Sequence, residues 1–231
     1  MRSYETDTGN ERTETPSVDA RLSAQGDDAA KKDTDRVEAF SDGVFAVALT
    51  LLVVSLTVPE IGAGRAASAS ALLQALAKQW PQFVAFAASF FSVLLLWVSH
   101  HQTFAMIRRT SRHLMLANGL LLFLVTLIPF PTAVLARYIQ TPGGSVVAAL
   151  YAGVLLLITA SFILLWHVVL SKPGMLKKEM TDAQKRALQR RNTLGLLPYV
   201  VAVGVAFWQP YLTVIMCICL SVYWVAAGGD S

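Results

Sequence analysis

Six apolar runs, each long enough to cross a bilayer as a helix, constrain this chain more than any other feature. The hydrocarbon core is ~30 Å thick, so a spanning helix needs about 20 residues and at least ~17. The last two runs lie near this lower limit. The runs cover residues 37–58, 80–104, 114–136, 145–170, 193–208 and 210–226. We therefore predict an all-α integral membrane protein with six transmembrane helices.

Charged residues are few and concentrated near the N-terminus. They make up 15% of the 231 residues, where soluble domains have about 25%, and ten of the fifteen acids lie in residues 1–38. This balance argues against a soluble enzyme, and against a nucleic-acid partner despite the net charge of +4. Residues 1–35 have almost no large apolar side chain and are predicted to form a disordered tail. The six-helix domain follows over residues 36–227, with a short tail at 228–231.

The Lys and Arg residues indicate the direction in which the helices cross. Sixteen of the nineteen lie in the N-terminal tail and its junction, the second loop and the fourth loop, which share one side of the predicted spans. The opposite side has only Arg65, Lys78 and Arg137. Cytoplasmic loops carry the excess of positive charge, so both termini are predicted to be cytoplasmic. The fourth loop is expected to form an amphipathic helix with a capping box at Thr181 and Gln184.

Polar side chains inside the runs gather near the cytoplasmic ends, and the helix centres are uncharged. Asp42 is the only acid well inside a run. Ion-coupled transporters place charged groups near the bilayer midplane, which weighs against a secondary transporter but leaves it as an alternative. The polar layer is expected to be a network of hydrogen bonds between helices. It contains Arg36, Ser41, Asp42, His100 and His101, and His167 lies near the same depth.

A membrane enzyme that uses His100 and His101 is a less favoured alternative. Histidine and aspartate are suitable metal ligands. However, neighbouring residues on a helix project about 100° apart, and no second paired-ligand motif accompanies the two histidines. We therefore predict no metal site, no cofactor and no enzymatic activity.

The first run has a narrow stripe of branched aliphatic residues and one hydroxyl. On a helical wheel with 100° per residue, Thr50, Leu51, Val54 and Val58 all fall near Val47. Phe40 and Gly43 extend the stripe toward the cytoplasmic end, and Asp42 points away from it. Such a face lines an axis, or it packs on another helix or on lipid, and periodicity leaves these possibilities open.

Three motifs resemble the transmembrane protein 175 family, the lysosomal-type potassium channels and their bacterial relatives. The first is Arg36-x-x-x-Phe40-Ser41-Asp42, the second runs from Trp97 to Phe104, and the third is Pro129-Phe130-Pro131-Thr132. This resemblance implies a potassium-selective channel in the bacterial plasma (inner) membrane. It also implies a homotetramer, with potassium as the permeant ion and the first helix of each chain lining the pore. The filter sequence Thr-Val-Gly-Tyr-Gly of ordinary potassium channels does not occur in the chain.

The resemblance also assigns roles to residues. It places the hydrophobic constriction at Val47, Leu51 and Val54, and a selectivity hydroxyl at Thr50. Relatives often have Ile or Leu where Val47 and Val54 stand, which implies a wider pore. The remaining motif residues are expected to hold the first helix against its neighbours. They are Arg36, Phe40, Ser41, Asp42, Trp97, His100, His101 and Asn118.

Overall fold

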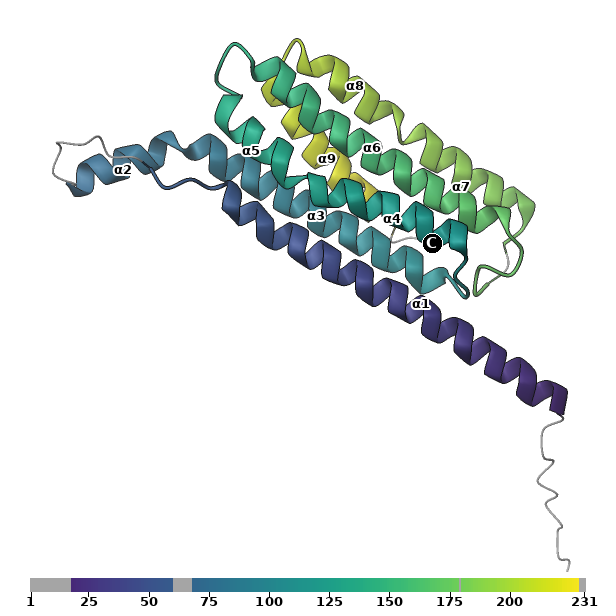
Figure 1. Ribbon diagram of the computed structural model, residues 1–231. Helices are drawn as coiled ribbons and strands as arrows, with labels where there is room; N and C mark the ends of the chain where they lie inside the picture. Colours follow the sequence, from purple (N-terminus) through teal and green to yellow (C-terminus); the bar gives the residue numbers. More distant parts are fainter. Residues whose placement is uncertain (1–17, 60–67, 179, 229–231) are drawn as a thin grey trace, which may run out of the picture.

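The computed structural model describes residues 18–59, 68–178 and 180–228. Within these ranges the regular elements are helices packed side by side as a bundle (Figure 1). The elements are α1 (Val18–Leu51), the 3₁₀ helix η1 (Leu52–Ser55), α2 (Ala69–Lys78), α3 (Trp80–Met106), α4 (Arg112–Leu127), α5 (Pro129–Tyr138), α6 (Gly144–Ser171), α7 (Asp182–Leu194), α8 (Leu197–Ala206) and α9 (Pro210–Gly228).

The all-helical class predicted from the sequence is confirmed. In the described part of the chain, four segments are long and apolar enough to cross a membrane: Asp28–Ser55, Trp80–Met106, Arg112–Tyr138 and Gly144–Ser171. These correspond to the first four predicted runs. The fifth run is divided between the end of α7 and the ten-residue α8. Pro198 causes this division because it has no N–H to bond the carbonyl of Leu194.

The core of the bundle forms around α6. This helix packs against α4, α5, α7, α8 and α9. Its buried side chains include Tyr151, Ile158 and Leu165, all nearly inaccessible. Gly144 starts α6 close to the preceding turn, and a Cβ atom there would lie 2.4 Å from the carbonyl oxygen of Ile139. Only glycine allows the chain to reverse at this distance.

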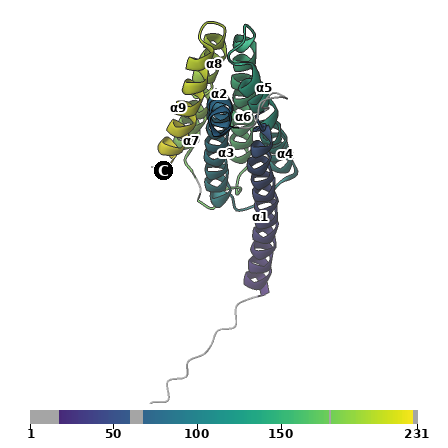
Figure 2. The same ribbon diagram turned by 90° about the vertical axis from the view of Figure 1, so that its left-hand side faces the viewer.

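The first helix lies at the edge of the bundle. It packs against α3 and α4, and its N-terminal part extends beyond them (Figures 1 and 2). Residues 18–35, assigned to the disordered tail from the sequence, are helical here, and residues 1–17 lie outside the described residues. This segment has many good helix formers, and a helix already nucleated inside the bundle extends at little cost per residue.

Proline divides the third predicted span into α4 and α5. The helix breaks at Ile128, directly before Pro129, which begins α5. Ile128 donates its N–H to the Val125 carbonyl in a tighter turn, at 3.1 Å. Prolines inside the third run are expected to bend it, and the structure has this bend as a break between α4 and α5.

Two loops join at the end of the bundle near the N-terminal half of α1. Ile107, after α3, pairs with Leu176, after α6, in an antiparallel bridge. Arg108 N donates to Met175 O at 2.8 Å, and Lys177 N donates to Met106 O at 2.9 Å. Gly174 has a φ of 72°, the left-handed conformation that glycine adopts without strain. The second and fourth loops, which the charge count places on one side, are thus in contact.

Candidate functional site

The stripe predicted on the first helix is uncovered by the rest of the chain. The exposed fractions are 54% for Val47, 46% for Leu51 and 73% for Val54, and Thr50 is also exposed. Phe40 extends the same uncovered side toward the N-terminal end. The helix therefore presents a row of bulky apolar side chains to something other than its own bundle.

The opposite face of α1 is buried. Ser41, Phe45 and Ala48, together with Leu52 at the start of η1, are at most 1% exposed and recur every three or four residues. This spacing places them on one side of a helix. The two faces explain why α1 has a fixed rotation: the buried row fits against α3 and α4, and the other row is left facing outward.

The 3₁₀ turn at the end of α1 keeps Val54 in line with Leu51. Side chains three residues apart eclipse one another in a 3₁₀ helix, and η1 begins directly after Leu51. Ser55 Oγ donates to Leu52 O at 2.6 Å and supports the turn. Thr57 then bonds Gln82 Oε1 through both its N–H and its hydroxyl, each at 3.1 Å, which ties this end of the segment to α3.

Thr50 presents an oxygen on the uncovered face. Its hydroxyl donates to the carbonyl oxygen of Val47 at 2.9 Å. Since the hydroxyl proton is used in this bond, the oxygen keeps its lone pairs as acceptors. Oxygen lone pairs are the ligands that alkali cations require. The face thus combines aliphatic side chains with a single group that can contact a cation.

A buried hydrogen-bonded chain joins α1, α4 and α3. Ser41 Oγ donates to Val37 O at 2.8 Å and accepts from Asn118 Nδ2 at 2.9 Å. Asn118 Oδ1 lies 2.9 Å from His100 Nε2. An amide oxygen can only accept, so Nε2 of His100 donates. The other ring nitrogen, Nδ1, is buried and has no partner in the described part of the chain. The imidazole packs between Phe45 and Phe104.

Two further bonds run between α1 and α3. Trp97 Nε1 donates to Asp42 Oδ1 at 2.8 Å, and His101 Nδ1 lies 2.8 Å from Glu38 Oε1. Glu38 and Asp42 are four residues apart on α1, and Trp97 and His101 are four residues apart on α3. The two contacts between the helices therefore lie one helical turn from each other. The rings of Trp97 and His101 stack, with centroids 5.9 Å apart. Asp42 thus points to α3 and away from the uncovered face.

Some predicted members of the polar layer lie elsewhere. Arg36 is exposed and has no hydrogen-bond or ion-pair partner among the described residues. His167 lies 3.5 Å from Gln189 of α7, apart from the network. His100 is buried while the side chain of His101 is 56% exposed, so the two do not converge on one site. Among the described residues, no three His, Cys, Asp or Glu side chains are grouped to hold a metal ion.

Sequence reasoning missed the role of Glu38 and a second polar cluster. Glu38 could have been found from the matched spacing of Glu38 and Asp42 with Trp97 and His101. The second cluster is in the core, where the Ser89 hydroxyl lies 2.7 Å from the Thr132 hydroxyl and donates to the Tyr151 hydroxyl at 3.2 Å. No sequence pattern links these three hydroxyls, because they come from α3, α5 and α6.

The chain is similar in sequence to known ion channels. Residues 36–129 match the family model described as endosomal/lysosomal potassium channel TMEM175. A potassium channel of Chamaesiphon minutus is 38% identical over 84% of this chain and 94% of its own length. A potassium channel of Streptomyces collinus is 41% identical over 78% of this chain and 86% of its own length.

A solved structure extends the likeness to the fold. It is the crystal structure of a lysosomal potassium-selective channel TMEM175 homologue from Chamaesiphon minutus. It superposes with a TM-score of 0.73 at 37% identity, and covers 87% of this chain and all of that one. The chain therefore belongs to the TMEM175 family.

Proposed function

We propose that this protein is a potassium-selective channel in which the uncovered face of α1 and η1 lines the ion path. One observation carries the proposal: Val47, Leu51 and Val54 are exposed in a row while the other side of the same helix is buried. The two bacterial relatives described above are named potassium channels. The sequence relationship and the unpartnered apolar row thus support the same function.

The ion path requires several copies of the chain. A single row of side chains at the edge of a bundle cannot enclose an axis, whereas copies related by rotation bring the same row together from each subunit. We take the number as four, as the family resemblance implies. The bonds between Asp42 and Trp97 and between Ser41 and Asn118 would then fix each pore-lining helix to its own subunit.

The constriction would act by excluding water. Val47, Leu51 and Val54 are spaced about 5–6 Å apart along the helix, and their apolar rings would make an ion lose its hydration shell. Hydrophobic constrictions of this kind gate channels by dewetting. The Thr50 oxygen, one position before Leu51, would supply a polar ligand next to this barrier and contribute to the choice of cation.

The proposed membrane arrangement has six spans with both termini in the cytoplasm of a bacterium. The four membrane-length segments are followed by residues 193–208, which comprise the end of α7 and all of α8, and by α9. These two stretches, near the lower length limit, would be the fifth and sixth spans. The positively charged loops meet at one end of the bundle, where Arg108 bonds Met175. This clustering supports a cytoplasmic position for that end under the positive-inside rule.

Potassium flux into liposomes tests the channel proposal. Purified wild-type protein is expected to carry electrogenic, non-saturating flux, and Leu51→Ala should increase it by widening the constriction. Leu157→Ala is the matched control, since Leu157 is 52% exposed on α6 and far from α1 in sequence. Absence of potassium flux, or equal flux in L51A, L157A and wild type, would contradict the proposal. A saturable, non-electrogenic signal would favour a secondary transporter.

A further inference from the structure

One end of the proposed ion path is formed by η1 and residues 56–58, a segment with little helical support of its own. The α-helical part of α1 ends at Leu51, and η1 follows with 3₁₀ geometry, whose hydrogen bonds are poorer than those of an α-helix. At Leu56 the backbone becomes extended, with φ −81° and ψ 117°. Val54 and Val58 are 73% and 87% exposed. Burial of their own side chains therefore does not fix the direction in which these two valines point.

Thr57 connects this segment to α3. The Ser55 hydroxyl bonds locally, to the carbonyl oxygen of Leu52. Thr57 instead donates both its N–H and its hydroxyl to Gln82 Oε1, each at 3.1 Å. A side-chain amide oxygen has two lone pairs and can accept both bonds. The first bond holds the backbone and the second holds a β-branched side chain that is already stiff at χ1. A single atom of Gln82 therefore fixes the orientation of residue 57.

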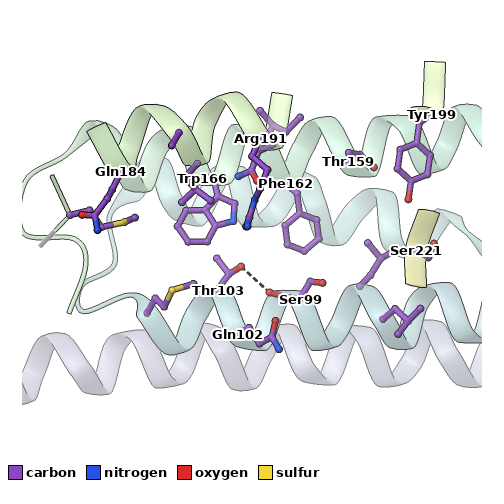
Figure 3. A pocket seen from close by; sticks show the side chains of 18 residues that line it. Ser99, Gln102, Thr103, Thr159, Phe162, Trp166, Gln184, Arg191, Tyr199 and Ser221 are labelled. Carbon is purple, nitrogen blue, oxygen red and sulfur yellow. Dashed lines mark hydrogen bonds between the residues drawn. The ribbon is translucent and has the colours of Figure 1, made fainter. Parts of the chain in front are cut away.

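Gln82 belongs to a well-supported part of α3. The buried Pro81 lies in the first turn of the helix, where its fixed φ suits a helix start. The backbone N–H of Gln82 donates to the carbonyl oxygen of Gln79 at 2.9 Å. A cavity of about 420 Å³ borders α3 from Leu95 to Met106 (Figure 3), and it begins about 20 Å along the helix from Gln82. The first turn of α3 is thus a firm base for the contact with Thr57.

We propose that Gln82 is a positioning residue of the ion path, which fixes the rotation of η1 through Thr57 and so directs Val54 and Val58 toward the axis. Thr57 lies three residues after Val54 and directly before Val58, so a fixed Thr57 restrains the chain on both sides. The buried Leu52 restrains the start of η1. Gln82 acts through Thr57 and without contact to the permeant ion. The proposal rests on the channel function proposed above.

Potassium flux and the potassium-to-sodium permeability ratio, both measured in liposomes, test this role. Gln82→Leu keeps a side chain of similar size and removes the acceptor. Losing a hydrogen bond of ordinary strength shifts an equilibrium by up to about tenfold. We expect flux to rise about threefold and the ratio to fall about threefold, because a loosened layer admits both hydrated cations. Gln209→Leu, the same exchange at an exposed position between α8 and α9, should change neither.

Variants of the bonded pair separate a specific contact from a general loss of structure. Gln82→Glu keeps acceptor oxygens and should retain the wild-type permeability ratio. Thr57→Val loses the hydroxyl bond alone, so its effect should be smaller than that of Q82L. The double variant T57V/Q82L should match Q82L, because Q82L has already removed both bonds. Additive effects, a wild-type ratio in Q82L, or a ratio in Q82E as low as in Q82L would overturn the proposal.

Cross-linking between chains measures the rotation of η1 without ion flux. On a background with Cys217→Ala and Cys219→Ala, a short bismaleimide should join Val54→Cys of neighbouring chains. Adding Gln82→Leu should slow this reaction at least threefold at an unchanged native mass, and adding Gln209→Leu should not slow it.

The two readouts distinguish failure of this inference from failure of the channel proposal. An unchanged cross-linking rate in Q82L would overturn the positioning role and leave the channel proposal standing. Absence of flux in wild type and Leu51→Ala, together with no cross-linking of V54C, would refute the channel proposal and the positioning role with it.

Discussion

Asn118 joins α1 to two other helices of the bundle through buried hydrogen bonds. Its amide donates to Ser41 on α1 and accepts from His100 on α3, while the residue itself belongs to α4. One side chain thus satisfies polar groups on two other helices. No water is available in the hydrocarbon region to replace these bonds. A change at this position therefore affects three helices at once.

Asn118→Ala is expected to destabilise the folded protein by about 1–3 kcal/mol, because it leaves buried polar partners unsatisfied. The measurement is the midpoint temperature of thermal unfolding in detergent. It is monitored by size-exclusion chromatography with fluorescence detection of the remaining folded protein. Thr126→Ala is the control, since it removes an exposed hydroxyl from the same helix. Equal midpoints for N118A and wild type would show that the bonded chain is not structural.

Asp42 gives a second prediction at this scale, because its acceptor role and its charge can be separated. Asp42→Asn keeps an oxygen for the Trp97 N–H, whereas Asp42→Ala removes it. We expect D42A to lower the yield of assembled channel severalfold and D42N to recover most of it. The potassium-to-sodium permeability ratio of the assembled D42A channel should equal that of wild type. An inverted ratio with full assembly would place Asp42 in the ion path instead.

At the scale of elements, α1 shows what the sequence could and could not predict. The alignment of Val47, Leu51 and Val54 on one face was predictable because they follow a helical period within one apolar run. Periodicity did not predict that the rest of the chain leaves this face uncovered. The helix over residues 18–35 was not, since polar composition alone describes a segment that cannot fold by itself. Its continuation depends on the helix already formed from residue 36 onward. The contact between Glu38 and His101 needed the relative position of two helices, which periodicity does not contain.

The break between α7 and α8 was also not predicted from the sequence. The sequence contains Pro198 inside the fifth run, and proline favours the first turn of a helix. Hydropathy averaged over the run conceals this signal. By contrast, the capping box at Thr181 and Gln184 is confirmed, with both of its bonds present, because a cap depends only on residues within one turn. Features that depend on residues within one turn, such as this cap, could thus be predicted from the sequence without knowing how the helices pack.

The rotation of η1 is tested by two neighbouring valines. Val53 and Val54 are both exposed, at 55% and 73%, but only Val54 eclipses Leu51. Val54→Asn should wet the constriction and raise potassium flux severalfold, whereas Val53→Asn should leave it near the wild-type value. Both variants add the same polar side chain to the same turn. Equal effects in V53N and V54N would show that this turn does not face the ion path.

At the scale of the whole molecule, the uncovered row of α1 is not covered by any other described part of the chain. Exposed apolar side chains in a membrane protein face lipid or another subunit, and a monomer would leave the Thr50 oxygen facing lipid. Closure around an axis would place that oxygen beside the ions and the aliphatic rows against one another. Helix association in membranes relies on such packing and on interhelical hydrogen bonds.

Two measurements test this closure: the number of chains in the complex, and the proximity of residue 54 in neighbouring chains. Native mass spectrometry of the wild-type protein should give four chains. On a background with Cys217→Ala and Cys219→Ala, Val54→Cys should be joined between chains by a short bismaleimide. Val222→Cys is the control, since Val222 is 53% exposed on α9. A monomeric mass, or cross-linking of V222C with none for V54C, would place another surface at the axis and leave the α1 row facing lipid.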